Sequence, residues 1–187
     1  TRDSVLKRDV LPRPYVIKPL NEGSSVGVKI VQKDTDLPAL SPETWPFGNE
    51  VMVEKFVPGR ELTVAVMGHR ALGVTELRTD EGFYDYKAKY TKGSTAHMVP
   101  APVPQTIYQA AINHALAAHE ILGCRGVTRA DLRYDDTLHD PGDLYLLEIN
   151  TQPGMTPLSL VPELASHAGI SFVELVTWMV ENAACDG

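Results

Sequence analysis

Cysteine is nearly absent from this 187-residue sequence, in which only Cys124 and Cys185 occur, far apart and outside any CxxC motif. Two such residues supply neither a disulfide framework nor a thiolate metal site. Long hydrophobic runs are missing too, because no stretch approaches the ~18–20 consecutive apolar residues of a membrane span. The N-terminus also lacks the charged-then-apolar order of a signal sequence. We therefore expect a cytoplasmic protein without a membrane partner.

Positive charge is in deficit, since 17 Lys and Arg stand against 24 Asp and Glu for a net charge of -7. The basic residues are scattered along the chain, whereas binding to nucleic acid needs them clustered, so we expect no nucleic-acid partner. HExxH is absent, and the one GxSxG match, Gly23 to Gly27, lies in a loop between two predicted strands rather than at the strand-to-helix turn of a nucleophile elbow. Covalent catalysis by serine and a histidine metal site are therefore disfavoured. The length and the 43% of apolar residues fit one domain or two closely packed lobes. Because the first residue is Thr1, we expect part of a longer protein.

Strands dominate the prediction for the first half of the chain, where short β-branched stretches are bounded by proline, glycine or asparagine. A small-residue loop at 21–27 joins the first two strands into a hairpin-like unit. The Pro58-Gly59 turn lies within an antiparallel meander of the next three. Residues 1–14 and 34–49 are predicted to be connecting segments, the second with room for one short helix. The predicted strands are 15–19, 28–31, 50–57, 61–67 and 71–77.

The second half of the chain is predicted to contain two helices and two strands. It is preceded by a polar, aromatic and proline-rich segment at 79–104 without clear periodicity, and such segments are usually functional or disordered. Apolar residues at spacings of four and three before Gly123 indicate the first helix, and a capping box of Ser171 and Glu174 starts the second. Strands and helices are segregated, which favours an α+β fold. The predicted helices are 107–122 and from about 172, and the predicted strands are 127–134 and 144–150.

Charged residues interrupt the last two predicted strands. Because strand side chains alternate between faces, Arg129 and Asp131 share one face, and Glu148 and Asn150 share one face of the other strand. If these strands pair, the side chains meet and offer the oxygen ligands that Mg²⁺ prefers. The alternative is that Arg129 and Asp131 simply form ion pairs with Glu148. The loop with Gly154 favours a site, because it leaves directly from the strand end.

The loop from Gly23 to Gly27 resembles a phosphate cradle. Its glycines let backbone N–H groups point inward as a nest, and its serine hydroxyls add donors. It is neither a Walker A loop nor a GxGxxG motif, and many small-residue hairpin loops bind nothing. Lys18, on the preceding strand, adds a positive charge toward phosphate, unless it is an ordinary solvent-facing lysine. Phosphate and metal chemistry is therefore favoured over covalent catalysis.

Seven stretches of the chain match a known family in combination and in order. They are Val16 to Pro19, Glu22 to Gly27, Phe83 to Tyr90, Gly126 to Asp131, Leu146 to Thr151, Pro153 to Thr156 and Ser159 to Pro162. Together they resemble the C-terminal two-thirds of the D-alanine:D-alanine ligases, which are ATP-grasp enzymes of peptidoglycan synthesis. The resemblance implies an α+β ATP-grasp fold whose two lobes, with antiparallel sheets, clasp a nucleotide. It places the small lobe at 1–57 and the large lobe at 58–187.

The resemblance also implies an ATP site with two Mg²⁺ ions, for which Mn²⁺ is an alternative. Asp131, Glu148 and Asn150 would hold the ions. Lys89 would reach the γ-phosphate, and Glu61 would bind the ribose, although from the sequence alone Glu61 is an exposed strand residue. The implied nucleotide-binding residues are Lys18, Glu22, Gly23, Ser24, Ser25, Glu54, Lys55, Phe56, Val57, Glu61, Phe83, Tyr84, Lys89 and Asn150.

The implied reaction joins two D-alanine molecules. The carboxylate of the first attacks the γ-phosphate of ATP to give an acyl phosphate, and the amine of the second then displaces phosphate. Arg129 and the N–H of Gly154 would form the oxyanion site. Ser159 and the N–H of Leu160 would receive the carboxylate of the second D-alanine.

Ser24 and Tyr90 complete the implied catalytic set. The aromatic segment 83–90 matches the mobile ω-loop that closes over the substrates and excludes water. Tyr90 stands where dipeptide-forming members have Tyr and depsipeptide-forming members tend to have Phe. D-alanine is therefore favoured over D-lactate as the second substrate.

Two departures from the family pattern bear on activity. The family's N-terminal domain, with the glutamate that orients the first D-alanine, is absent from this chain, whereas Gln152, where many members carry Ser, is expected to be neutral. One alternative is therefore a Mg-nucleotide-binding fragment that is inactive without its N-terminal domain. Another is an ATP-grasp carboxylate-amine ligase with a different substrate. The full-length protein is expected to be a homodimer.

Overall fold

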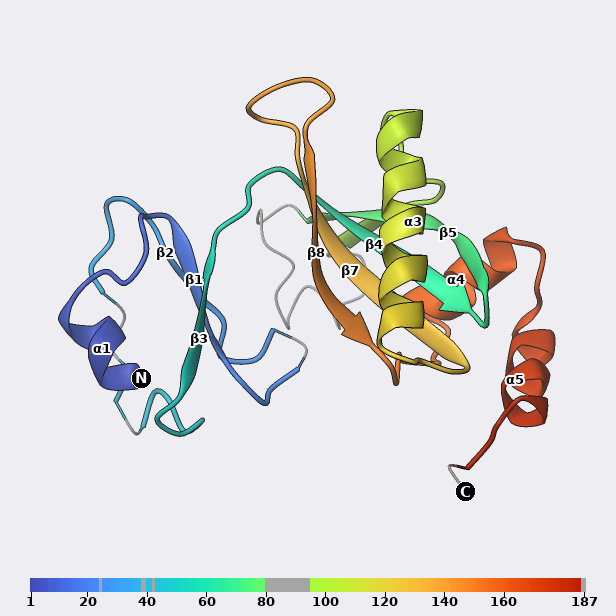
Figure 1. Ribbon diagram of the computed structural model, residues 1–187, viewed down its shortest axis with the longest axis horizontal. Coiled ribbons are helices and arrows are strands. Elements are labelled where there is room, and N and C mark those ends of the chain that lie inside the picture. The colour runs from blue at the N-terminus through green and yellow to red at the C-terminus, as the bar shows by residue number, and fades with distance from the viewer. Residues whose placement is uncertain (24, 38–39, 42, 80–94, 186–187) are drawn as a thin grey trace. The chain divides into compact units, whose positions relative to one another are not determined.

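The computed structural model describes residues 1–187 except 24, 38–39, 42, 80–94 and 186–187. The chain divides into two compact units, one formed by Thr1–Val57 and the other by Pro58–Arg78 with the described residues from Ala96 onward. The elements in chain order are α1 (Arg2–Lys7), β1 (Tyr15–Pro19), β2 (Lys29–Val31), β3 (Val51–Lys55), β4 (Arg60–Met67), β5 (Arg70–Thr79), β6 (Thr95–Met98), α3 (Gln105–Ile121), β7 (Val127–Asp135), β8 (Asp143–Asn150), α4 (Leu160–His167) and α5 (Phe172–Glu181) (Figure 1).

The first unit is a three-stranded antiparallel sheet in the order β2-β1-β3 with α1. The predicted hairpin is confirmed, because Tyr15 pairs with Val31 and Ile17 with Lys29. Burial alternates along β1, so that one face enters the core while Lys18 lies on the other. The core residues are Val5, Tyr15, Ile17, Val31, Leu40 and Trp45.

The second unit is a five-stranded antiparallel sheet in the order β6-β5-β4-β7-β8, with helices on both faces (Figure 1). Its first cluster joins α3 to the sheet through Ile107, Ala111, Ala115, Leu62, Val64, Ala130 and Leu132. The second joins α4 and α5 to the opposite face through Leu164, Leu175, Ala65, Leu72 and Val127. The α+β prediction is confirmed.

The predicted three-strand meander is wrong. β3 pairs with β1 of the first sheet, with Glu54 opposite Val16, and only β4 and β5 continue as antiparallel neighbours. Pro58 has no backbone N–H for a sheet ladder, and Gly59 has a φ of 86°, so the chain leaves β3 there.

Three short elements were not predicted. Residues 1–14 contain α1, which has six residues and no side-chain cap, and 79–104 contains β6, which has four. α4 has only eight residues, too few for a clear apolar period, and Pro162 lies in its first turn, where proline is tolerated. In the described part of 34–49 there is no helix.

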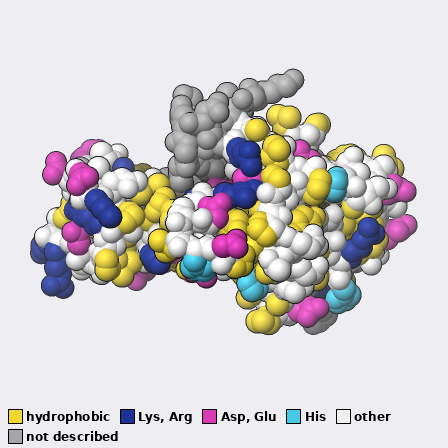
Figure 2. Space-filling model, turned by 90° about the horizontal axis from the view of Figure 1, so that it is seen from above, with side chains coloured by type: hydrophobic (Ala, Val, Ile, Leu, Met, Phe, Trp, Pro, Cys, Tyr) yellow, Lys and Arg dark blue, Asp and Glu magenta, His cyan; other side chains and the backbone are white. Residues whose placement is uncertain are grey.

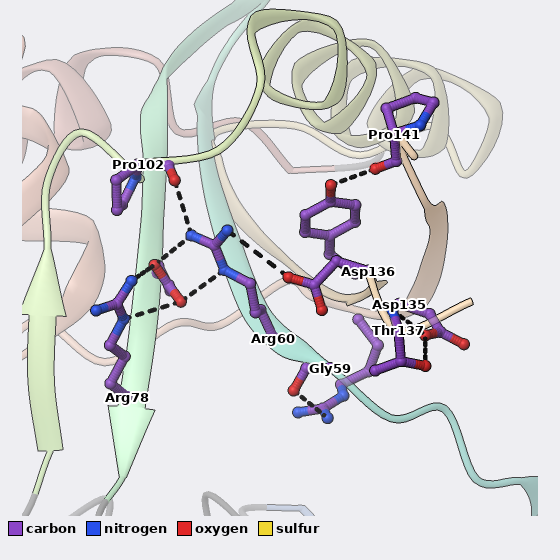
Figure 3. Close-up of polar contacts among 11 residues, drawn as sticks. Gly59, Arg60, Arg78, Pro102, Asp135, Asp136, Thr137 and Pro141 are labelled. Carbon is purple, nitrogen blue, oxygen red and sulfur yellow. Dashed lines mark hydrogen bonds and ion pairs between the residues drawn. The ribbon is translucent and has the colours of Figure 1, made fainter. Parts of the chain in front are cut away.

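A network around Glu76 joins β4 to β5 and to the segment before α3 (Figure 3). The Glu76 carboxylate is buried and accepts hydrogen bonds from Arg60 Nε (2.8 Å) and Nη2 (2.6 Å) and from Arg78 Nη2 (3.0 Å). Arg60 also donates to the Pro102 carbonyl and lies over the Tyr134 ring. Burial alone would raise the pKa of Glu76, but the hydrogen bonds from the two arginines outweigh it and lower the pKa. The network fixes the start of β4, next to Glu61.

The surface mixes side chains of both signs. On the face shown in Figure 2, Lys and Arg side chains are spread among acidic and apolar ones. Among the residues that the structure describes, no helix combines the length and the apolar character needed to cross a membrane.

Candidate functional site

A polar patch covers the face of β4, β7 and β8 that points away from α3. The strands pair as predicted, and Asp131 lies opposite Glu148, while Arg129 lies opposite Asn150. A register shift next to Asp131 marks a β-bulge, a feature common beside active sites. The patch consists of three cross-strand rows, namely Glu61-Arg133-Tyr145, Thr63-Asp131-Glu148 and Ala65-Arg129-Asn150.

Asp131 is the most heavily hydrogen-bonded carboxylate of the patch. Arg129 Nε donates to its Oδ1 (2.8 Å) and Arg129 Nη2 donates to its Oδ2 (2.7 Å), a bidentate ion pair between neighbours on one face of β7. The Thr63 hydroxyl of β4 donates to Oδ1 from the other side (2.7 Å). The alternative of an ion pair with Glu148 differs from this arrangement, because Arg129 pairs with Asp131 of its own strand and Glu148 is exposed.

The donor set fits a magnesium ion. Asp131 and Glu148 supply carboxylate oxygens on paired strands, and Asn150 supplies an amide oxygen that accepts one hydrogen bond, from Gln152 N–H (2.9 Å). In the described parts of the chain, no group of three or more His, Cys, Asp and Glu is placed to hold a metal by itself. Mg²⁺ needs no such cage, because one or two carboxylates, water and phosphate oxygens complete its octahedron.

Glu61 pairs with Arg133 rather than projecting freely into solvent. Arg133 Nη1 lies 3.6 Å from Glu61 Oε2, and the two side chains are only 12% and 18% exposed. Arg133 Nη2 donates to the Gly59 carbonyl (2.9 Å), which ties the pair to the turn before β4. Burial lowers the pKa of Arg133, and the neighbouring Glu61 carboxylate opposes that shift. The ion pair holds the Glu61 carboxylate in place on the patch, where it could accept a hydrogen bond from a ligand hydroxyl.

The loop from β8 to α4 brings Gly154 against Ser159. A Cβ at Gly154 would lie 2.8 Å from Ser159 Oγ, closer than real side chains come, so only glycine fits without a shift. Ser159 Oγ accepts the Thr156 N–H (3.0 Å) and lies 2.9 Å from Thr156 Oγ1. Ser159 is the N-cap of α4, and Leu160 is its first residue. Backbone N–H groups at a helix start favour a carboxylate ligand.

The first unit carries the remaining described candidates. Lys18 Nζ lies 2.6 Å from Glu54 Oε2, which joins β1 to β3 on the face away from the core. Ser25 has a φ of 60°, unusual for a residue other than glycine, and Gly27 (φ 74°) packs against the Phe47 ring. Glu22 and Gly23 lie exposed in the same loop, Lys55 is exposed at the end of β3, the Phe56 N–H donates to the Pro14 carbonyl, and Val57 follows.

Five predicted site residues, namely Ser24, Phe83, Tyr84, Lys89 and Tyr90, lie outside the described residues. Three polar residues of the patch, Thr63, Arg133 and Tyr145, were missed by the sequence analysis. The available signal was strand alternation, because Thr63 follows Glu61 by two residues and Arg133 follows Asp131 by two.

Two antiparallel sheets in separate α+β units, a glycine-rich hairpin loop and an Asp-Glu-Asn patch define an ATP-grasp protein. Within that class, the chain belongs to the D-alanine:D-alanine ligase family, since the model "D-ala D-ala ligase C-terminus" matches residues 5–181. The expected resemblance is confirmed over nearly the whole chain.

Named relatives agree with this family. A D-alanine--D-alanine ligase of Rhodospirillum rubrum is 60% identical over 99% of the chain, and one of Paramagnetospirillum magneticum is 62% identical over 95%. The chain covers 60% and 58% of their lengths, so it spans less than two-thirds of these relatives.

Solved structures give the same family. The D-alanine--D-alanine ligase of Bacillus anthracis complexed with ATP matches with a TM-score of 0.69 at 32% identity, covering 90% of this chain and 53% of that one. The VanG D-Ala:D-Ser ligase of Enterococcus faecalis matches with a TM-score of 0.76 at 30% identity, covering 92% and 50%.

Proposed function

We propose that this chain is the nucleotide-binding and second-substrate part of an ATP-dependent ligase. The enzyme would join two D-alanine molecules through an acyl phosphate and so make D-alanyl-D-alanine for peptidoglycan in the cytoplasm. The observation that carries the proposal is the polar patch, with Asp131 facing Glu148, at the start of a loop in which Gly154 lies against Ser159. The names of the relatives and the ATP of the Bacillus anthracis structure support the same activity.

The first unit, at 1–57, would be the small lobe that holds the base and the phosphates. Lys18 supplies positive charge on the exposed face of β1, and Glu54, Lys55, Phe56 and Val57 would line the adenine. The loop at Glu22, Gly23, Ser24 and Ser25 would cover the phosphates, and Phe83, Tyr84 and Lys89 would complete the nucleotide site.

The second unit, at 58–187, would be the large lobe that carries the ribose, metal and reaction sites. Glu61, held by Arg133, would accept the ribose hydroxyls. Asp131, Glu148 and Asn150 would hold Mg²⁺ or Mn²⁺. The bound metal would neutralise charge on the phosphates and make the γ-phosphorus a better electrophile.

Arg129 and the loop after β8 would act on the reacting carboxyl group. Arg129 carries a guanidinium on the same face as the metal ligands, and together with the Gly154 N–H it would stabilise the oxyanion formed when the amine attacks the acyl phosphate. Ser159 and the Leu160 N–H at the start of α4 would orient the second D-alanine by its carboxylate. Ser24 and Tyr90 would complete the catalytic set.

Two alternatives remain open, with specific observations behind each. The chain spans about 60% of the length of the Rhodospirillum rubrum relative, and one alternative is a nucleotide-binding fragment that is inactive without an N-terminal domain. The VanG neighbour is a D-Ala:D-Ser ligase, so a different second substrate is also compatible with this architecture.

The test is phosphate release from Mg-ATP by the chain and by the longer protein, with D-alanine and with D-alanine plus D-serine or D-lactate, and with mass spectrometry of the products. We expect D-alanine-dependent phosphate release and the D-alanine dipeptide from the longer protein. Mixed products in preference to the dipeptide would overturn the assignment of the second substrate.

Thermal unfolding of the chain distinguishes a fragment that binds nucleotide without turnover from a chain that has no nucleotide site. A ligand that binds only the folded chain raises its melting temperature. If Mg-ADP raises it without turnover, the chain is a nucleotide-binding fragment. If Mg-ADP neither binds nor raises it, the nucleotide site itself is refuted.

A further inference from the structure

The buried Thr63 side chain makes a hydrogen bond to the Asp131 carboxylate of the patch. Its side chain on β4 is fully buried (0% exposed), and its hydroxyl lies 2.7 Å from Asp131 Oδ1 on the neighbouring strand. The same hydroxyl lies 3.2 Å from the Ala130 carbonyl. Since it has one proton and the carboxylate is the nearer and charged acceptor, the bond to Asp131 is the stronger one.

The other donor to Asp131 is unsuited to a state in which a cation is bound. Arg129 contacts both carboxylate oxygens, and its positive charge repels a metal ion placed on them. The Thr63 hydroxyl is neutral, and of the two Asp131 carboxylate oxygens it contacts only Oδ1. Oδ2 is therefore open to a cation once Arg129 turns away. Thr63 can therefore hold Asp131 both with and without a metal ion.

Thr75 provides a built-in comparison. It lies directly opposite Thr63 on β5, it is equally buried (0% exposed), and its hydroxyl has no hydrogen-bond partner among the described residues. The two threonines share residue type, burial and sheet row, and they differ in the contact with Asp131. A hydroxyl that served only strand packing would be equally dispensable at both positions.

We propose that Thr63 is a positioning residue that orients the Asp131 carboxylate for metal binding. The inference rests on the proposed function, because it takes Asp131 as a metal ligand. Hydrogen-bond partners of metal ligands fix the orientation of the ligand, and their loss typically weakens metal binding by about 10- to 100-fold.

The experiment measures Mn²⁺ binding to the chain in the presence of ADP, by electron paramagnetic resonance, for the wild type and for Thr63→Val, Thr63→Ser and Thr75→Val. Valine keeps the shape of threonine without the hydroxyl, and serine keeps the hydroxyl. We expect Thr63→Val to weaken Mn²⁺ binding at least about tenfold, and Thr63→Ser and Thr75→Val to stay near the wild type. ADP binding in EDTA and the melting temperature of the metal-free chain are measured alongside.

The outcomes separate the two proposals. If the wild type binds no Mn²⁺ with ADP, the metal site of the proposed function fails. If the wild type binds and Thr63→Val binds equally well, or if Thr63→Val and Thr75→Val weaken binding equally, the role of Thr63 is refuted. If Thr63→Val does not fold, Thr63→Ser and Thr63→Ala take its place, and serine must then retain the affinity that alanine loses.

Discussion

Replacing Gly154 by alanine should have opposite effects on stability depending on residue 159. In the native chain the new Cβ would come within 2.8 Å of Ser159 Oγ, so that oxygen must move. The move breaks its contacts with the Thr156 N–H at 3.0 Å and the Thr156 hydroxyl at 2.9 Å. Each hydrogen bond contributes about 0.5–1.5 kcal/mol, so their loss should cost the second unit about 1–3 kcal/mol, which outweighs the smaller gain from replacing glycine by alanine.

In a Ser159→Ala background the same substitution should be harmless. Without the hydroxyl, the nearest atom to the new Cβ is the residue 159 Cβ at 3.7 Å, an ordinary contact. Gly154 does not have a positive φ, so alanine fits its backbone and restricts the unfolded chain, which stabilises by about 0.4–1 kcal/mol. The effect of Gly154→Ala should therefore change sign between the two backgrounds.

The assay is a double-mutant cycle in urea, followed by circular dichroism at the helical band. That signal reports mainly the second unit, because α3, α4 and α5 lie there, whereas among its described residues the first unit has only the six-residue α1. The gain from restricting the unfolded chain is the same in both backgrounds, so the two substitutions should fail to add by about 1–3 kcal/mol, the contribution of the two lost hydrogen bonds. Additivity to within about 0.5 kcal/mol would refute the close contact, and with it the claim that glycine is needed to seat Ser159.

Four further substitutions test the packing of the second unit. Glu76→Gln should destabilise the chain by about 1.5–3 kcal/mol at neutral pH, because it weakens charged hydrogen bonds in a buried network. Since the folded-state pKa of Glu76 is lowered, its contribution is present above the ordinary value of 4.5 and lost as pH falls through the lowered pKa, so urea titrations at several pH values should show a shallower acid loss in the variant. Burial lowers the pKa of His119, which favours its neutral form in the folded chain, so the wild type should lose stability as pH falls below about 6.5 and His119→Gln should not share that loss. Gly59→Ala and Gly169→Ala both place alanine at a positive φ, which costs about 1–2 kcal/mol. Of the two, only the new Cβ at Gly59 would overlap a backbone oxygen, that of Tyr134, so Gly59→Ala should lose about 1–3 kcal/mol more in thermal or urea unfolding. Equal losses would contradict the contact.

Strand alternation explains why the patch could be predicted in part. The period of two places Arg129 with Asp131, and Glu148 with Asn150, whatever the strands pair with, and the short turn-rich link between the strands favours their pairing. This alternation does not show which other strand lies beside β7. Nothing local in 61–67 says that β4 lies beside β7, and for that reason Thr63 was missed. Arg133 lies on β7, two residues after Asp131, so the same alternation indicates it, and the sequence analysis overlooked it.

The errors in the predicted fold occur where contacts between distant residues decide the structure. The meander prediction assumed that strands adjacent in the sequence are also adjacent in the sheet, which is usually the case. Here β3 pairs instead with β1, through contacts between residues about 35 positions apart. α4 has a proline and eight residues, and its stability comes from burying Val161, Leu164 and Ala165 against the sheet rather than from helix propensity. Tertiary packing decides both features, and neither leaves a signal in the local sequence.

The position of the site follows from how far α4 covers the sheet. Ala65 and Val127 lie on the same face as the patch, and both are buried against the cluster that contains α4. Arg129, in the same row as Ala65 and one row beyond Val127, is only partly covered, and further along the same face Asp131 and Arg133 lie outside the apolar cluster that contains α4. The loop that contains Gly154 joins Asn150, the last residue of β8 and a member of the polar patch, to the start of α4, the helix that packs on the apolar part of the same face. The proposed function places the activated carboxyl group at Arg129 and the carboxylate of the attacking amine at Ser159, and this loop is the stretch of chain that joins the two, because it leaves β8 at Asn150, opposite Arg129, and ends at the N-cap of α4.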